Sequence, residues 1–158
     1  MKTAAELIAQ LSLAPHPEGG WYREVHRSSE LLQTPRGPRA ALTSIYYLLE
    51  TPQFSRWHVV GSDEAWHFHD GSPLELLVYQ PTTGELSSRV LATPSAGYEP
   101  VHTVRAGEWQ AARSLGPWTL MGCDVGPGFD FEDFQFIAGV EGHEVHFRTA
   151  LREFRHLL

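Results

Sequence analysis

The residue types best suited to chemistry are concentrated between positions 58 and 71 of this sequence. Three histidines, two aspartates and one glutamate lie within this stretch. Neutral imidazole and carboxylate groups together bind divalent transition metals, and they also transfer protons near neutral pH. Composition therefore supports both metal binding and proton transfer here. The spacing of the residues has to decide between these two chemistries.

Strand geometry divides these side chains into two sets. Successive residues of an extended strand point to opposite faces, so His67 and His69 share one face. Glu64, Trp66 and Phe68 share the other, and without a bulge the two sets cannot face one cavity. We expect the histidines to line the outer sheet or a subunit interface. We expect the two aromatic rings to belong to the core or the pocket wall, where a ring-shaped ligand could stack on them.

Length and composition indicate one globular domain over residues 1–158. Of the 158 residues, 42% are hydrophobic and 20% charged, which suffices for a single buried core. The net charge of −7 provides no basic surface, so neither nucleic acid nor a membrane is an expected partner. The single cysteine, Cys123, cannot form an internal disulfide. With neither a secretion signal nor a long apolar span in view, we expect a cytoplasmic protein.

The order of the elements predicts an all-β fold flanked by two helices. A Thr-x-x-Glu capping pattern predicts a helix over about residues 3–12. Apolar residues at helical spacing predict a second helix over about residues 145–157. Between them, over about residues 20–138, short β-rich runs alternate with turn residues, as in a sandwich or barrel. The expected strands are Trp21–Arg27, Ala40–Leu49, Gln53–Val59, Glu64–His69, Leu74–Gln80, Glu85–Leu91, Val101–Arg105, Trp109–Arg113, Trp118–Val125 and Asp133–Ala138.

Two motifs resemble those of a known superfamily. The spacing of His58, Glu64 and Gly71 resembles the first conserved motif of the cupins, G-x5-H-x-H-x3-E-x6-G. The segment from Arg105 to Gln110 resembles the second motif, P-x-G-x2-H. In this segment Arg105 takes the place of the proline and Gln110 takes the place of the histidine. The chain is also similar to one branch, the Cupin_5 (DUF985) family of uncharacterised cupins, over roughly residues 3–138. The segments that carry this similarity are Pro15–Glu24, Asp63–Gly71 and Pro127–Phe131.

The resemblance implies a specific architecture and a set of ligand positions. The implied fold is a double-stranded antiparallel β-barrel of the jelly-roll type, with both helices outside it. A homodimer is the expected state, because cupins commonly pair through sheet edges. Four positions correspond to the metal ligands of the family, and here they are occupied by His58, Val60, Glu64 and Gln110.

This donor set is poor for a tightly bound metal. Val60 cannot ligate and Gln110 offers only a neutral amide oxygen, so fewer than the usual three good protein ligands remain. We therefore predict no firm cofactor. At most we expect a weak divalent-metal site on His58, Glu64 and Gln110, completed by water or a substrate oxygen. A histidine at position 67 or 69 would join it only through a bulge.

Without a metal, His58 and Glu64 can act as an acid/base pair. Burial raises the pKa of a carboxyl and a neighbouring carboxylate raises that of a histidine, so either group can titrate near pH 7. Metal-free cupins that epimerise nucleotide-linked sugars abstract protons in this way. That similarity of fold favours an isomerase or epimerase acting on a small polar, sugar-like metabolite. The residues expected to contact this ligand are Tyr22, Arg23, Trp66, Phe68 and Gln110.

Two other functions and one structural interpretation stay open at this point. The pocket could belong to a non-catalytic module that senses or sequesters a small molecule. A metal-dependent oxygenase or lyase is less favoured, because of the donor set. The structural interpretation is that His58 and Glu64 form a buried pair that only stabilises the fold.

Overall fold

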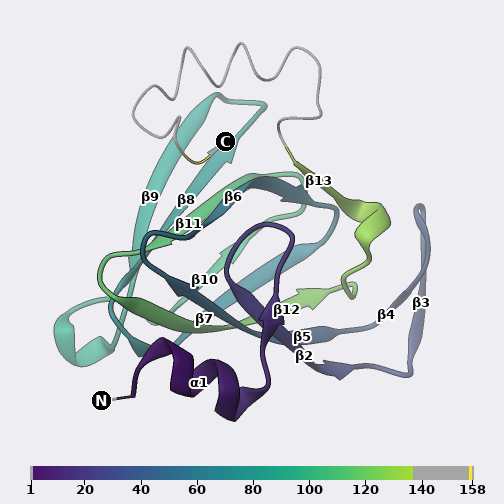
Figure 1. Cartoon of the computed structure of the whole chain (residues 1–158). Coiled ribbons are helices and arrows are strands. Elements are labelled where there is room, and N and C mark those ends of the chain that lie inside the picture. Colours follow the sequence, from purple (N-terminus) through teal and green to yellow (C-terminus); the bar gives the residue numbers. More distant parts are fainter. Residues whose placement is uncertain (1, 137–156, 158) are drawn as a thin grey trace.

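The main feature of the molecule is a pair of antiparallel β-sheets that face each other (Figure 1). The computed structural model describes residues 2–136 and residue 157. In this part of the chain, the first sheet contains, in spatial order, β1 (Ala14–Pro15), β2 (Trp21–Arg27), β5 (Thr43–Glu50), β12 (Trp118–Gly126), β7 (Asp63–Gly71) and β10 (Val101–Val104). The second sheet contains β13 (Phe134–Phe136), β6 (Phe54–Val60), β11 (Trp109–Ser114), β8 (Leu74–Gln80) and β9 (Glu85–Leu91).

Neighbouring strands in the sequence alternate between the two sheets. β5 belongs to the first sheet, β6 to the second, β7 to the first and β8 to the second. This alternation is the jelly-roll arrangement that the sequence predicts. Within the described residues, however, no hydrogen-bonded ladder joins one sheet to the other. The expected closed barrel is therefore observed as two open sheets, because each sheet ends in its own edge strands.

An apolar core fills one end of the space between the sheets. Tyr47, Trp66 and Met121 of the first sheet are buried there. Leu76 and Val78 of the second sheet complete the same cluster. Each fully buried side chain of this kind contributes about 1.5–3 kcal/mol of hydrophobic stabilisation. The core therefore holds the two sheets at a fixed distance.

Helix α1 (Ala4–Leu11) covers part of the outer face of the first sheet. The Thr3 side chain accepts a hydrogen bond from the Glu6 N–H, and the Glu6 carboxylate accepts one from the Thr3 N–H at 2.7 Å. This reciprocal capping confirms the helix that the sequence predicts. Leu7 of the helix packs against Leu48 of β5, which anchors the helix on the sheet.

The outer face of the second sheet carries another apolar cluster. Trp57, Tyr79 and Trp109 contribute to it, and the fully buried Leu157 packs among them. The predicted helix over residues 145–157 otherwise lies outside the described residues. In the described part of the chain, no helix has the length and apolar character that a bilayer span requires.

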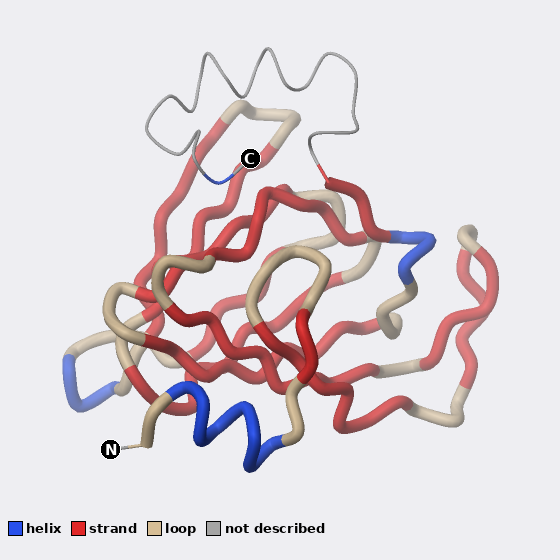
Figure 2. The backbone as a smooth tube through the Cα atoms, viewed as in Figure 1, coloured by secondary structure: helices blue, strands red, loops and turns tan. Residues whose placement is uncertain are grey.

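Most predicted strands are present, but one hairpin was not expected. β2, β8 and β9 have the predicted bounds, and Figure 2 shows how strongly strands predominate. The unexpected hairpin consists of β3 (Leu31–Thr34) and β4 (Gly37–Ala40). Its strands are short, β3 is mostly exposed, and in β4 the two buried residues, Arg39 and Ala40, are consecutive, so neither strand has the alternating pattern that marks a half-buried strand. Two short 3-10 helices complete the described elements, at Pro94–Ala96 and Phe131–Asp133.

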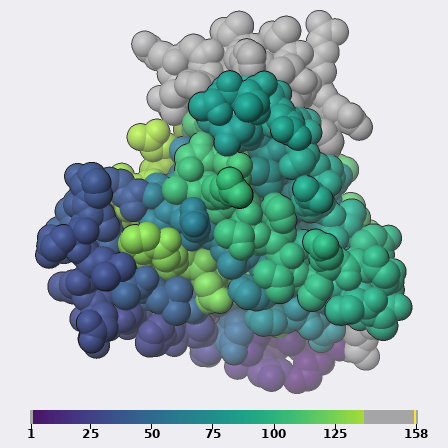
Figure 3. Space-filling view, turned by 180° about the vertical axis from the view of Figure 1, so that it is seen from behind, coloured from purple at the N-terminus to yellow at the C-terminus, as the bar shows by residue number. Residues whose placement is uncertain are grey.

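The hairpin lies beside the segment that connects β12 to β13. Figure 3, seen from behind, shows the blue atoms of the hairpin region next to the yellow-green atoms of this later segment. Arg39 of β4 donates two hydrogen bonds of 2.9 Å, from Nε and Nη2, to the carboxylate of Asp133. Both side chains are almost fully buried. The pair therefore ties residues that are far apart in the sequence to one wall of the molecule.

Candidate active site

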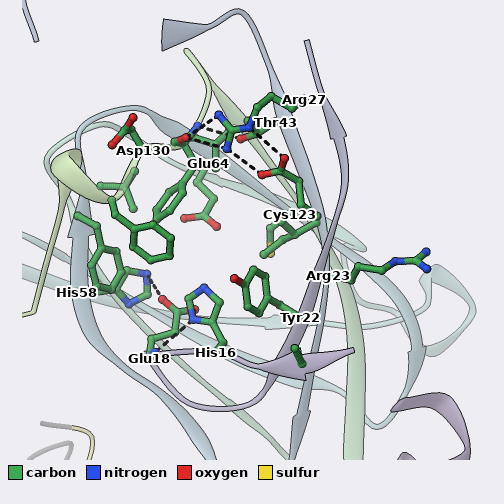
Figure 4. Close-up of a pocket in the computed structure, with 18 of the residues that line it drawn as sticks. His16, Glu18, Tyr22, Arg23, Arg27, Thr43, His58, Glu64, Cys123 and Asp130 are labelled. Atoms are coloured by element: carbon green, nitrogen blue, oxygen red, sulfur yellow. Dashed lines mark hydrogen bonds and ion pairs between the residues drawn. The ribbon is translucent and has the colours of Figure 1, made fainter. Parts of the chain in front are cut away.

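The end of the inter-sheet space that the core leaves open forms a cavity of about 470 Å³. Its buried floor carries Glu18, His58, Glu64 and Cys123, each less than a tenth exposed. Its rim carries Glu24, Arg27, Asp130 and Phe131. Figure 4 shows these polar groups arranged around one open space. A concave site of this size with a few convergent polar groups is typical of small-molecule binding.

The loop between β1 and β2 delivers Glu18 to the floor. Gly19 has a φ of 109°, in the left-handed region that favours glycine. A Cβ at Gly19 would clash with the backbone oxygen of Phe54, so glycine lets the loop approach β6 closely. The Arg56 N–H donates to the Glu18 carbonyl at 3.0 Å and fixes the loop there. The Glu18 side chain is thereby aimed at His58, which lies on β6 two residues after Arg56.

His58 and Glu18 form a hydrogen-bonded pair. Nε2 of His58 lies 3.1 Å from Oε2 of Glu18, and Nδ1 lies 2.7 Å from the Arg56 carbonyl oxygen. Because a carbonyl oxygen can only accept, Nδ1 carries a proton. Burial raises the pKa of Glu18 and lowers the pKa of His58, so both shifts favour the neutral forms. The hydrogen bond between Nε2 and Oε2 requires one proton between these two atoms, so the pair carries no net charge and holds a proton that it can donate.

Gln110 holds the second carboxyl of the floor in place. The Trp66 indole Nε1–H donates to Oε1 of Gln110 at 2.9 Å. An indole N–H can only donate, so this contact fixes the orientation of the Gln110 amide. Its Nε2 then donates to Oε2 of Glu64 at 2.5 Å. The chain Trp66–Gln110–Glu64 therefore orients the Glu64 carboxyl from behind the floor.

The environment of Glu64 shifts its titration to neutral pH. Burial, opposed by the electrostatic interaction with His58, raises the pKa of Glu64 to about 7. Burial also raises the pKa of the adjacent Cys123 thiol, which is protonated at neutral pH. A carboxyl with a pKa near 7 can both accept and return a proton under physiological conditions. Glu64 is therefore suited to the role of general base.

A bulge in β2 brings Arg27 to the rim. The register between β2 and β5 shifts between Glu24 and His26, so Glu24 and Arg27 reach the same face of the sheet. Arg27 donates from Nε and Nη2 to the Glu24 carboxylate at 3.0 and 2.8 Å. It also donates to the Phe129 carbonyl at 3.2 Å. The positive charge at the rim is thus already paired with protein groups.

The segment between β12 and β13 supplies an aromatic wall. The ring of Phe134 stacks on the ring of His58, with centroids 5.2 Å apart and 28° between the planes. The ring of Phe129 makes an edge contact with that of Phe134 at 6.0 Å. The Arg39–Asp133 pair described above anchors this segment. The wall is therefore held against the floor by a buried ion pair and not by the floor residues alone.

The five residues expected to contact a ligand lie in four different places. Tyr22 lines the cavity. Trp66 and Phe68 belong to the apolar core, and Gln110 lies behind Glu64. Arg23 borders the cavity, but its guanidinium lies over a tyrosine ring of β5, 5.6 Å from the centroid. Figure 4 shows it directed away from the open space, so Arg27 is the arginine of the rim.

His67 and His69 lie on the outer face of the first sheet. Nε2 of His67 is 3.1 Å from Oδ2 of Asp124, and both side chains are more than a third exposed. His69 lies against Gly122, where an added Cβ would meet its imidazole. Glu64 faces the cavity on the opposite side. This arrangement agrees with the strand alternation on which the sequence analysis relied.

The floor does not fit the divalent metal that many cupins hold. The amide oxygen of Gln110 is taken by Trp66, and its NH2 group faces Glu64. Both ring nitrogens of His58 are engaged, and Val60 offers no donor. Among residues 2–136, no group of three His, Cys, Asp or Glu side chains is placed to hold an ion. The weak site expected on His58, Glu64 and Gln110 is therefore not assembled, because Gln110 serves as a hydrogen-bond donor.

The fold and the two motif regions define a cupin. The chain belongs to the Cupin_5 family, whose family model, described as "Cupin superfamily (DUF985)", matches residues 5–137. A hypothetical protein from Leishmania major is 29% identical, with a TM-score of 0.84 and coverage of 96% of this chain and 98% of that one. A structural-genomics protein from Shewanella oneidensis is 32% identical, with a TM-score of 0.86 and coverage of 100% and 98%.

A more distant similarity extends to the wider superfamily. Oxalate decarboxylase from Bacillus subtilis is 12% identical, with a TM-score of 0.59 and coverage of 91% of this chain and 36% of that one. At this identity the similarity shows the fold alone. No curated protein matches the sequence.

Several residues of the cavity were not expected from the sequence. His16 and Glu18 lie in a loop whose only sequence signal is an acidic residue followed by two glycines. Arg27 reaches the rim only because of the bulge in β2, which no pattern in the sequence marks. The wall residue Phe129 comes from a segment that resembles a simple loop, whereas Phe134 lies in the expected strand Asp133–Ala138 and begins β13. Apart from Phe134, these residues share one property, which is that a loop or bulge positions them.

Proposed function

We propose that this protein is a metal-independent acid/base enzyme of the isomerase or epimerase type, acting on a small polar, sugar-like metabolite. The observation that carries the proposal is the Glu64 carboxyl, with a pKa raised to about 7, on the floor of a ligand-sized cavity. The uncharged Glu18–His58 pair on the same floor supplies a proton donor. A general base and a general acid in one buried site are what carbon–hydrogen proton transfer requires.

The reaction needs no group beyond those of the chain. The Glu64 carboxylate removes a proton from the carbon next to a substrate carbonyl, and the C–H electron pair forms a carbon–carbon double bond. Glu18 donates its proton to the carbonyl oxygen, which gives an enediol. Glu64 then returns its proton to the former carbonyl carbon, and Glu18 recovers one from the enediol hydroxyl on the original carbon, which becomes the new carbonyl. Return to the other face of the original carbon would give the epimer, and no electron enters or leaves.

Deuterium exchange tests this proposal directly. The protein is incubated in D₂O with a panel of aldoses, ketoses and amino sugars, and NMR follows deuterium at the carbon next to the carbonyl. Glu64→Gln should lower the exchange rate by about 10²–10⁴-fold, the usual worth of a positioned acid or base. His67→Gln, which alters only the outer face, is the matched control and should not change it. A sugar that stabilises the protein against heat yet shows no exchange would contradict the enzymatic proposal.

A non-catalytic binding module is the second candidate, and one observation favours it. Both ring nitrogens of His58 are engaged by protein groups, Nδ1 by the Arg56 carbonyl and Nε2 by Glu18. A binding protein needs no free imidazole nitrogen. An enzyme, in contrast, would have to move the proton between Nε2 of His58 and Glu18 during turnover. Binding without exchange in the same experiment would support this candidate.

A further inference from the structure

Negative charge predominates around the cavity. The acidic residues that line it are Glu18, Glu24, Glu64 and Asp130. The two arginines at its border are Arg23 and Arg27. Arg27 is bound to the Glu24 carboxylate and a backbone carbonyl, and Arg23 points away (Figure 4). Among the described residues that line the cavity, no guanidinium or ammonium group is therefore free to meet an anionic ligand.

A further cation, Arg56, also lies outside the cavity lining. The guanidinium of Arg56 is 4.4 Å from the centroid of the Phe136 ring and donates to the Pro17 carbonyl. Arg56 is exposed and is not part of the cavity lining. An anion on the floor would meet the Glu64 carboxylate without a compensating charge, which is strongly unfavourable at a buried position.

The cavity walls add a second preference. The aromatic residues that line the cavity are Tyr22, Phe129, Phe131 and Phe134. The faces of aromatic rings attract cations, and the attraction grows when water is excluded. Glu64 is 8% exposed, and Gln110, which holds its Oε2, is an uncharged donor. A cationic ligand would supply the positive charge that this buried carboxylate lacks.

We propose that the cavity selects ligands that carry a protonated amine, placed at Glu64, with the rest of the ligand against the aromatic wall. The inference rests on the proposed function for its site and names the class of substrate, an amine-bearing polar metabolite such as an amino sugar. The selectivity arises because the buried Glu64 carboxyl is available to a ligand, whereas the arginines at the border are bound to protein groups or point away. An ammonium group makes a charge-assisted hydrogen bond with Glu64, an alcohol makes a neutral one, and a carboxylate is repelled.

Three probes of nearly the same shape test this inference, namely benzylamine, benzyl alcohol and benzoate. Calorimetry at about pH 8, where the Glu64 carboxylate predominates, should give an affinity for benzylamine at least about tenfold higher than for benzyl alcohol. Benzoate should show no binding. Equal or tighter binding of benzoate, or no binding of benzylamine at millimolar concentration, would overturn the inference.

A variant shows whether Glu64 causes the preference. Glu64→Gln retains the shape of the side chain and removes its charge, so it should bring benzylamine and benzyl alcohol to within about twofold of each other. His67→Gln is the control and should retain the full preference. An unchanged preference in Glu64→Gln would assign the selectivity to another group and contradict the inference.

The inference and the proposed function can fail separately. Benzylamine has no carbonyl, so its binding reports on the site and not on turnover. If benzylamine binds but amino sugars show no deuterium exchange, the selectivity for amines stands and the proposed enzymatic activity is contradicted. If neutral sugars show exchange but benzylamine does not bind, the enzymatic proposal stands and the proposed selectivity for amines is contradicted.

Discussion

The two faces of β7 carry opposite kinds of chemistry although their residues alternate in the sequence. On the inner face, Glu64 and Trp66 are almost fully buried, and burial raises the pKa of Glu64 to about 7. On the outer face, His67 is more than a third exposed and pairs with an exposed Asp124. Histidine is the residue that normally titrates near pH 7. Here a carboxyl has acquired that property, which shows that burial and not residue type decides which face can do acid/base chemistry.

Removal of an inner-face ring should have the largest effect on stability. Trp66→Ala deletes a buried side chain and the donor that fixes Gln110, so we expect a loss of about 3–5 kcal/mol in the free energy of unfolding. Urea denaturation followed by circular dichroism measures it. His67→Ala on the opposite face is the control, and a comparable loss in that variant would invalidate the contrast between the faces.

The pH dependence of stability should identify Glu64 as a buried carboxyl. Its pKa rises from 4.5 to about 7 on folding, so between these values the native state holds more protons than the unfolded state. The free energy of unfolding therefore falls as pH increases, by about 3 kcal/mol in total for this group. Glu64→Gln should match the wild type near pH 4.5 and exceed its stability by about 3 kcal/mol above pH 7.

The histidines on the floor do not confuse this comparison. Burial lowers the pKa of His16 and of His58, so their contribution has the opposite sign and stability increases with pH through their titration. The contribution of His16 largely cancels in the difference between variant and wild type, because its shift arises from burial, Glu18 and His58. Glu64 raises the pKa of His58, so this pKa is lower in Glu64→Gln and the difference increases with pH in the same direction. A difference that stays constant across the whole pH range would show that Glu64 does not titrate as described.

The outer face should give the smallest effect. His67 and Asp124 form an exposed pair, and such pairs contribute about 0–1 kcal/mol. His67→Gln should therefore change the free energy of unfolding by less than about 1 kcal/mol at any pH between 5 and 8. The same denaturation measurements provide the number. A loss above about 2 kcal/mol would mean that the outer face is buried against something, as a subunit interface would be.

Sequence patterns predicted the parts of the site that stand on regular strands. Alternation along β7 separated Glu64 from His67, and the motif resemblance located His58, Glu64 and Gln110 on different strands. The same reasoning assigned Arg23 to the ligand and overlooked Arg27, because the bulge in β2 reverses the facing of the later residues. It also overlooked Glu18, the partner of His58, because a loop reaches the floor only through backbone conformations that depend on neighbouring strands.

By itself, the sequence determined the family, most of the strands, the helix cap at Thr3 and the chemical types of the residues at the metal-ligand positions. These properties depend on residue type and short-range spacing, which a linear pattern retains. Only the tertiary structure decided that Glu18 lies against His58, that Gln110 donates to Glu64, and that both cavity arginines are unavailable to a ligand. Those contacts join residues up to 102 positions apart, and their energies depend on burial, which exists only once the two sheets have packed.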